Sequence, residues 1–341
     1  MSIIVTGSVA FDYLMSFPGH FSEHILPDQI HHVSLSFLVD SMRKQRGGCA
    51  PNIAYSLALL GERPTVMATV GQDFGEYRAW LEKTGVDTSA ILEVPDEFTS
   101  SFFVNTDLDN NQIASFYIGA MAQADKLSFY DLDHQTIALA VISPNAPLAM
   151  VKYARECHEL SIPYIYDPSQ QIVRLTGEEL VEGCRGAQML IVNDYEYGLI
   201  RSKTGLSDEA LLGLPRVTII TRGAEGSTIH GDGETLFVPV VSPKHLAEPT
   251  GVGDAFRAGV IKGMLRGYSW TTTGRIAALA ATYVLEQHGT QNHHYSLDEF
   301  VARFRQVFGD APELEDLGNR SGHVPMGPCT PQRRTQEGGK T

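Results

Sequence analysis

The sequence alternates short β-rich runs with longer helix-like stretches along most of its length. The β-rich runs are residues 3–6, 65–70, 138–143, 163–167, 189–193 and 217–221. The helix-like stretches between and after these runs are residues 52–60, 74–84, 148–160, 195–202, 208–212, 255–266, 273–288 and 297–307. Strands that alternate with helices predict a parallel sheet covered by helices on both faces. We therefore expect an α/β fold with three layers, α/β/α, around a mostly parallel central sheet.

Polar residues stand at or just after the ends of several predicted strands. Ser8, Asp167 and Asn193 occupy such positions. In open α/β sheets, ligands bind outside the carboxyl ends of the strands. We therefore expect the functional site at this edge of the sheet.

Two stretches, residues 11–40 and 101–117, interrupt the alternation. The second reads SFFVNTDLDNNQIASFY, in which two β-rich runs flank a polar turn, and this pattern predicts a hairpin. We expect the two stretches to form a small β-sheet lid over the site. The predicted division is a large domain of residues 1–8, 46–97 and 121–310, a lid of residues 9–45 and 98–120, and a flexible polar tail of residues 319–341. Lid strands have edges that pair readily, so a homodimer through the lid and a monomer with a covered edge both remain open.

Composition excludes several classes of partner. The 341 residues carry a formal net charge of −14, and no basic stripe is evident, so we expect no nucleic-acid partner. No apolar run approaches the roughly 18 residues that a membrane span requires. The start of the chain lacks the basic region of a signal peptide, and the four cysteines form no CxxC pair. These features predict a cytoplasmic protein with reduced thiols and no membrane partner.

A glycine loop followed by an acid occurs in EPTGVGDAFRAG, residues 248–259. The backbone N–H groups of Gly251, Val252 and Gly253 can converge on one point, and the helix that follows adds its positive dipole end. This arrangement suits a phosphate, with Asp254 as a base beside it, although the same pattern alone is more often a plain helix cap. The chain has no GxxxxGK[ST] and no GxGxxG after its first strand, which disfavours Walker and Rossmann nucleotide sites.

A second glycine motif precedes another predicted helix. Residues 46–54 read RGGCAPNIA, in which paired glycines are followed by Asn52. Paired glycines allow a ligand to approach the backbone closely, and the Asn52 amide can both donate to and accept from hydroxyl groups. By itself the segment is equally compatible with a simple helix N-terminus.

The two motifs, in this order and together with NDYE at residues 193–196, resemble the PfkB/ribokinase-like carbohydrate kinase family. The family's second signature reads close to DTxGAGDxFxxG, and Glu248 replaces its first Asp. NDYE matches the family's NxxE motif. The resemblance covers roughly residues 1–310 and implies a ribokinase-like fold and phosphoryl transfer from ATP with Mg²⁺.

A narrower resemblance points to bacterial adenosine kinases of the actinobacterial type, which phosphorylate the 5′-hydroxyl of adenosine. It is carried by FSEHILPDQIHHVSLSFLVD, NQIASFY, DPSQQIVRL, NDYE and PTGVGDAFRAG. Pro51 stands where a glycine is usual, and Ile118 stands where a proline is usual. The leading hypothesis is therefore an adenosine kinase. The alternatives are a kinase for inosine or guanosine, a sugar kinase for an acceptor such as ribose, and a non-catalytic nucleoside-binding regulator.

The resemblance also implies roles for individual residues. Asp254 is the general base, and Gly251, Val252 and Gly253 form the anion hole. The predicted acceptor contacts are Ser8, Asp12, Ser36, Gly48, Asn52, Phe102, Phe116, Gln170, Gln171 and Arg174. Of these, Asp12, Gly48 and Asn52 bind the sugar diol, and the two phenylalanines offer apolar faces to a purine. Arg174 either reaches the transferring phosphate or forms a surface salt bridge.

The remaining predicted residues lie on the ATP side. Asn193, Thr221, Gly223 and Gly226 form the predicted ATP set, and Asn193 and Glu196 act on Mg²⁺ through its waters. In the superfamily a monovalent cation often supports the anion hole. Glu248 and Thr250 occupy the matching K⁺ positions, and the change from Asp to Glu leaves dependence on K⁺ open.

Overall fold

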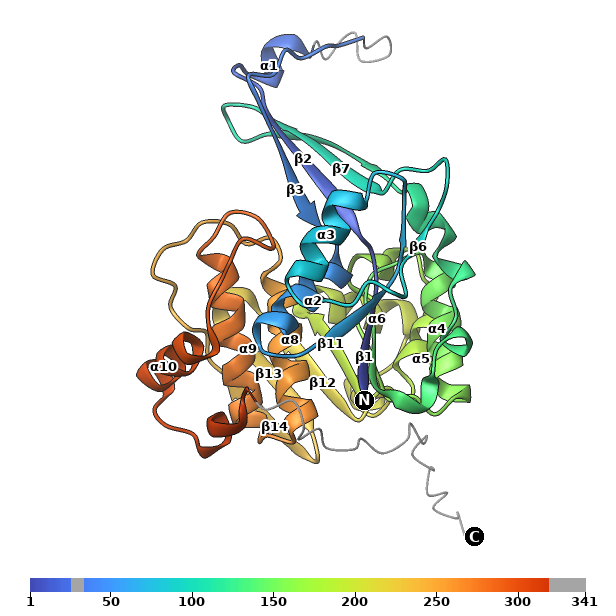
Figure 1. Ribbon diagram of the computed structural model, residues 1–341, viewed down its shortest axis with the longest axis vertical. Coiled ribbons are helices and arrows are strands. Elements are labelled where there is room, and N and C mark those ends of the chain that lie inside the picture. The colour runs from blue at the N-terminus through green and yellow to red at the C-terminus, as the bar shows by residue number, and fades with distance from the viewer. Residues whose placement is uncertain (26–33, 319–341) are drawn as a thin grey trace.

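The computed structural model of the protein describes residues 1–25 and 34–318. Its central sheet has eight strands in the order β14-β13-β12-β11-β10-β9-β1-β4 (Figure 1). These strands are β1 Ser2–Thr6, β4 Pro64–Met67, β9 Ile137–Ile142, β10 Tyr164–Tyr166, β11 Met189–Asn193, β12 Val217–Thr221, β13 Ser227–Gly231 and β14 Glu234–Val238. All pairings from β4 to β12 are parallel, and β13 and β14 are antiparallel. The predicted α/β fold with a mostly parallel sheet is therefore confirmed.

Helices cover both faces of this sheet. These helices are α2 Cys49–Leu59, α3 Gly75–Lys83, α4 Pro147–Glu159, α5 Gly177–Cys184, α6 Asp194–Thr204, α7 Asp208–Leu212, α8 Val252–Arg266, α9 Trp270–Leu285 and α10 Leu297–Phe308. A further short helix, α1 Phe21–His24, lies away from this sheet (Figure 1). The 3₁₀ turns are η2 Gly119–Lys126, η3 Phe129–Asp131, η4 His134–Thr136, η5 Ser169–Val173, η6 Gly223–Glu225 and η7 Pro312–Asp316. In β1, Ile3 and Val5 enter the core beneath α2, α8 and α9, whereas Ile4 enters the core beneath α4 and α5. This alternation follows from the two-residue period of a strand.

A second sheet has four strands in the order β3-β2-β7-β8. It consists of β2 Ala10–Ser16, β3 Ser41–Gly47, β7 Ser100–Thr106 and β8 Gln112–Tyr117, and we call it the lid sheet. Figure 1 shows it projecting above the central sheet, with α1 at its far end. The predicted hairpin forms β7 and β8, which pair antiparallel, whereas β2 and β7 pair in parallel. The division into two domains at the predicted boundaries stays a prediction.

The hairpin of β13 and β14 and helix α5 are among the elements that were not anticipated from the sequence. The hairpin of β13 and β14 turns at Asp232 and Gly233, both with positive φ, and Asp-Gly is a strong signal for such a turn. Helix α5 begins with a capping box in which Thr176 and Glu179 bind each other's backbone N–H groups. The predicted strand of residues 65–70 is divided into β4 and β5 Thr69–Val70, and β5 forms a separate parallel pair with β6 Leu92–Glu93.

Some sequence predictions lie outside the described residues. The tail of residues 319–341 and part of the stretch 11–40, namely residues 26–33, belong to this group. None of the helices in the described ranges combines the length and the apolar character that a bilayer crossing requires.

Candidate functional site

A cavity of about 320 Å³ lies between the lid sheet and the carboxyl edge of the central sheet. Its volume is on the scale of small-molecule sites, which span about 300–1,000 Å³. It brings together most of the predicted acceptor residues with the glycine loop, namely Ser8, Asp12, Gly48, Asn52, Phe102, Phe116, Gln170, Gln171, Thr250, Gly251 and Asp254. Ala10, Cys49, Met121, Pro144 and Thr290 complete its lining.

Gly48 is required where α2 meets the end of the first strand. Its φ is 96°, and an added Cβ would lie 2.5 Å from the backbone oxygen of Ser8. The hydroxyl of Ser8 accepts a hydrogen bond of 3.2 Å from the N–H of Cys49. The close approach that only glycine permits therefore places Ser8 and the N-terminus of α2 on the same cavity wall.

Asp254 lies in the first turn of α8, which begins after Gly251 in a left-handed conformation. Its Oδ2 accepts a hydrogen bond of 2.8 Å from Nδ2 of Asn52. Oδ1 of Asn52 accepts a hydrogen bond of 2.9 Å from Nε2 of Gln291, which also donates to the hydroxyl of Tyr77. Because Oδ1 of Asn52 is taken by a donor, its Nδ2 must face Asp254. Gln291 and Tyr77 were not foreseen, and no short motif marks them.

The two cavity carboxyls have raised pKa values. Burial raises the pKa of Asp254 to about 6, against the opposing effects of Arg257 and the hydrogen bond from Asn52. Burial also raises the pKa of Asp12 to about 6, and the negative charge of Glu248 adds to this rise. Both groups therefore remain largely ionised at neutral pH, and each titrates close to it, as is common for groups that exchange protons.

An ion pair that the sequence analysis missed lies beneath Asp254. Nη2 of Arg257 donates to Oδ1 of Asp167 over 2.6 Å, and Nε of Arg257 contacts the other carboxylate oxygen. Asp167 is 1% exposed, directly after β10, and burial raises its pKa to about 7 in spite of Arg257. The available signals were the strand-end position of Asp167 and the placement of Arg257 one turn after Asp254.

The predicted ATP-side residues gather at the ends of β11 and β12. Asn193 and Thr221 are direct neighbours in the pairing register of these strands. Gly223 begins the turn after β12, and Gly226 has a φ of 88° with an added Cβ 2.4 Å from the Val238 backbone oxygen. These four residues lie outside the lining of the cavity, on a neighbouring part of the same sheet edge.

Asn193 and Glu196 form a capping box at the start of α6. Oδ1 of Asn193 accepts from the N–H of Glu196 over 2.7 Å, and Glu196 Oε2 accepts from the N–H of Asn193 over 2.8 Å. Glu196 Oε1 accepts from the Ser169 hydroxyl over 3.0 Å. Each carboxylate oxygen keeps lone-pair capacity for a water molecule. The pair therefore fits the expectation of Mg²⁺ held through its waters, since magnesium retains several of them.

The predicted K⁺ pair is divided between two environments. Oε2 of Glu248 accepts from the N–H of Gly289 over 3.0 Å, and Thr250 is exposed at the cavity wall. Ser36 and Arg174 are exposed and are not among the residues that line the cavity. Val252 and Gly253 are the first residues of α8, whose first backbone N–H groups have no partner within the helix. The N–H of Val252 donates to the backbone oxygen of Pro249 over 3.3 Å.

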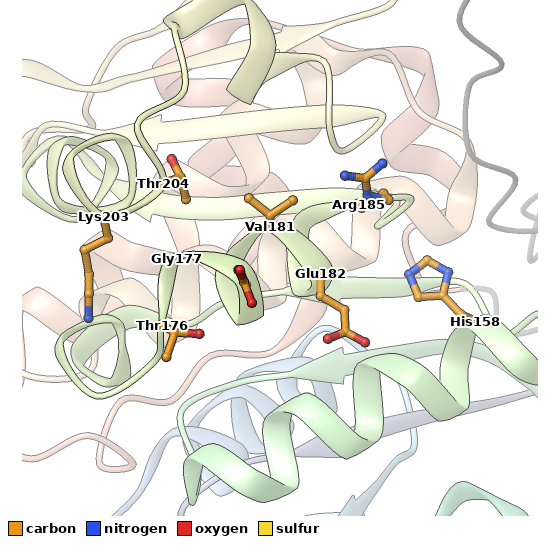
Figure 2. A pocket seen from close by; sticks show the side chains of 9 residues that line it. His158, Thr176, Gly177, Val181, Glu182, Arg185, Lys203 and Thr204 are labelled. Carbon is orange, nitrogen blue, oxygen red and sulfur yellow. The ribbon is translucent and has the colours of Figure 1, made fainter.

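A larger hollow of about 810 Å³ lies elsewhere, between α4, α5 and α6 (Figure 2). Its polar lining is occupied by structural interactions. The ammonium group of Lys203 donates to the backbone oxygens of Ile172 and Val173, and Glu182 pairs with Arg155. None of the predicted site residues lines this hollow, so the cavity beneath the lid sheet is the stronger candidate site.

Known proteins with related sequences and structures show the family to which the chain belongs. Residues 8–296 match the family described as pfkB family carbohydrate kinase. A nucleoside kinase from Methanothermobacter thermautotrophicus is 31% identical over 318 residues, covering 92% of this chain and 98% of the relative.

Solved structures extend the comparison to the fold. A nucleoside kinase from Burkholderia thailandensis in complex with inosine has a TM-score of 0.82 at 35% identity, covering 91% of this chain and 100% of that chain. The nucleoside kinase of Methanocaldococcus jannaschii has a TM-score of 0.81 at 26% identity, covering 90% and 99% of the two chains. The likeness thus extends over both the central sheet and the lid sheet, and the chain belongs to the PfkB family of carbohydrate kinases, phosphotransferases that act on hydroxyl groups.

Proposed function

We propose that the protein is an ATP-dependent nucleoside kinase that converts adenosine to AMP by phosphorylating its 5′-hydroxyl, a reaction of purine salvage. The observation that carries the proposal is that Asp254 and two phenylalanines of the lid sheet line the same cavity. Phe102 and Phe116 are directly paired across β7 and β8, and both line the cavity. A sugar alone offers no flat apolar face to these rings, whereas a purine does.

In the proposed reaction, the carboxylate of Asp254 accepts the proton of the 5′-hydroxyl while the new O–P bond forms and the bond to the ADP oxygen breaks. The N–H groups of Gly251, Val252 and Gly253 stabilise the negative charge on the transferring group. Asn193 and Glu196 would hold Mg²⁺ through its waters, and the bound ion would supply charge neutralisation of the ATP phosphates. The chain's own contribution is positioning, for which Asn52 holds Asp254 and Asp12 accepts from the ribose hydroxyls.

Inosine is the second candidate acceptor. The supporting observation is the Burkholderia thailandensis nucleoside kinase, whose structure contains inosine and which is 35% identical to this chain. Adenine and hypoxanthine present similar faces to Phe102 and Phe116 and differ in the hydrogen bonds of their edges. The side chains of Gln170 and Gln171 line the same cavity and can donate and accept such bonds.

The test is ADP release with MgATP across adenosine, inosine, guanosine, ribose and fructose 6-phosphate, with Asp254→Asn alongside. We expect turnover of purine nucleosides, with adenosine preferred, and a loss of turnover in the variant. Turnover of a sugar alone would refute the roles of the two phenylalanines. Normal nucleoside binding without any ATP consumption would instead indicate a non-catalytic regulator.

Two further proposals concern the cation and the assembly. A K⁺ site at Glu248 and Thr250 predicts faster turnover in potassium than in sodium buffer, and equal rates would refute it.

A homodimer through the lid is proposed because all six residues of β8 are exposed at the edge of the lid sheet. Light scattering that gives the mass of one chain would refute the dimer.

A further inference from the structure

We infer that Arg257 contacts the transferring phosphoryl group and that Asp167 is the positioning residue that holds its guanidinium there. The inference rests on the proposed phosphoryl transfer. It adds the positive charge of a side chain to an anion hole that otherwise consists of the backbone N–H groups of residues 251–253. In phosphoryl-transfer enzymes a precisely placed arginine stabilises the charge that spreads over the transferring oxygens.

The guanidinium lies beside the anion hole. Arg257 follows Asp254 by three residues in α8, so the two side chains share one helix face. A Cβ added to Gly253 would lie only 2.7 Å from Nη1 of Arg257. The guanidinium therefore packs against the backbone of Gly253, in the turn whose N–H groups are proposed to receive the phosphate.

Asp167 fixes the orientation of this guanidinium. It contacts both Nη2 and Nε of Arg257, which leaves Nη1 as the nitrogen that faces Gly253. A carboxylate that holds the guanidinium at two nitrogens sets its plane as well as its position. Asp167 extends from the end of β10, so the central sheet supplies a fixed anchor for the charge on α8.

The charge balance of the site favours a ligand role over a purely structural ion pair. A cation near a helix N-terminus is opposed by the helix dipole, whereas Arg266 lies in the last turn of the same helix, where the dipole favours it. Asp167 and Asp254 both act electrostatically on the guanidinium before ATP arrives. The phosphates of ATP add further negative charge, so they offer an additional anionic partner to Nη1, the nitrogen that Asp167 does not contact.

The experiment compares Arg257→Ala, Arg257→Lys and Asp167→Asn with wild type. We expect Arg257→Ala to lower kcat by about 10³-fold with an unchanged dissociation constant for the nucleoside. Arg257→Lys should recover part of the loss, and millimolar guanidinium chloride should partly restore Arg257→Ala. Asp167→Asn should lower kcat, and added guanidinium should not restore it, because the guanidinium of Arg257 is still present in this variant but is misplaced.

Arg303→Ala is the matched control, because it removes an arginine from another buried ion pair, with Glu286, away from the cavity. Its kcat should stay near wild type and should not respond to guanidinium. Wild-type turnover in Arg257→Ala would overturn the inference, as would a loss that neither lysine nor guanidinium reverses and that also weakens nucleoside binding. Wild-type turnover in Asp167→Asn would overturn the positioning role.

The proposed function can fail separately. If wild type phosphorylates none of the acceptors, the affinity of MgATP for each variant is measured by calorimetry, which needs no acceptor. Weaker MgATP binding in Arg257→Ala than in Arg303→Ala would then still support the phosphate contact, and equal binding would overturn it.

Discussion

Asp254 is the side chain whose charge state bears most directly on the proposed reaction. Only its ionised form can accept a proton, and burial raises its pKa to about 6. We therefore expect kcat/KM to be highest above pH 6 and to fall as the pH decreases through about 6. The pKa of Asp12 is also raised to about 6, so two protonations steepen this fall. A profile that stays flat down to pH 5 would contradict the assignment.

The same raised pKa has a consequence for stability. A carboxyl group that ionises near 3.8 when unfolded and near 6 when folded loses its proton more readily from the unfolded chain. The stability it contributes is therefore present at low pH and is lost as the pH rises through this window. At pH 7 the buried charge of Asp254 is destabilising, so Asp254→Asn should raise the melting temperature while it abolishes turnover. A lower melting temperature at pH 7 would contradict this expectation and would show that Arg257 and Asn52 together outweigh the cost of burial.

Gln291 tests the hydrogen-bond chain that orients Asp254. Gln291→Leu leaves Oδ1 of Asn52 and the hydroxyl of Tyr77 without this donor, and an unsatisfied buried group costs about 1–3 kcal/mol. We expect a stability loss of this size and a lower kcat, because the amide of Asn52 can then rotate away from Asp254. Gln112→Leu, at an exposed position of the lid sheet, is the control and should change neither quantity.

At the scale of elements, the junction between the first strand and α2 depends on Gly48. In Gly48→Ala, the alanine has to adopt the positive φ of this position, and its Cβ lies against backbone atoms of Ser8 and Val9. Gly85 has a similar φ of 94°, but an added Cβ there meets nothing within 4 Å. Gly85→Ala should therefore cost only the backbone strain, roughly 1–3 kcal/mol. Gly48→Ala should cost more and should also raise the KM for the nucleoside. Equal losses by chemical denaturation would refute the steric account.

The elements also show what the sequence can and cannot reveal. The parallel strands were predictable because their β-rich runs are local patterns, and the Asp232-Gly233 turn was a local signal that was overlooked. The parallel pairing of β2 with β7 was not predictable, because residues far apart in the chain set its register. The predicted acceptor residues from five separate segments reach one cavity because the lid sheet, which carries Asp12 and the two phenylalanines, faces the carboxyl edge of the central sheet. The pairing of Asp167 with Arg257 depends on the distance between β10 and α8, which no local pattern encodes.

At the scale of the whole molecule, a buried charge pair joins α8 to the loop after α2. The ammonium group of Lys262, which is 0% exposed, donates to Glu62 over 2.6 Å. Nη2 of Arg266 also lies 3.5 Å from Oε1 of Glu62, so this carboxylate is shared by two buried cations. Removal of one partner of a buried pair typically costs about 3–5 kcal/mol. Because Arg266 still compensates part of the charge of Glu62, we expect Lys262→Met to lower the free energy of unfolding by an amount near the lower end of this range. The exposed pair of Arg305 and Asp310 is the control, and Arg305→Ala should cost about 0–1 kcal/mol. Similar losses in both variants would contradict this reading.

The cavity has walls from two different sheets. Phe102 and Phe116 belong to the lid sheet, whereas Asp254 and Asn52 belong to helices packed on the central sheet. A nucleoside that stacks on the phenylalanines and presents its hydroxyl to Asp254 therefore acts as a cross-link between the sheets. Dissociation of the nucleoside and separation of the lid sheet from the central sheet are then a single kinetic step. The residence time of the nucleoside therefore depends on the lid sheet as much as on Asp254.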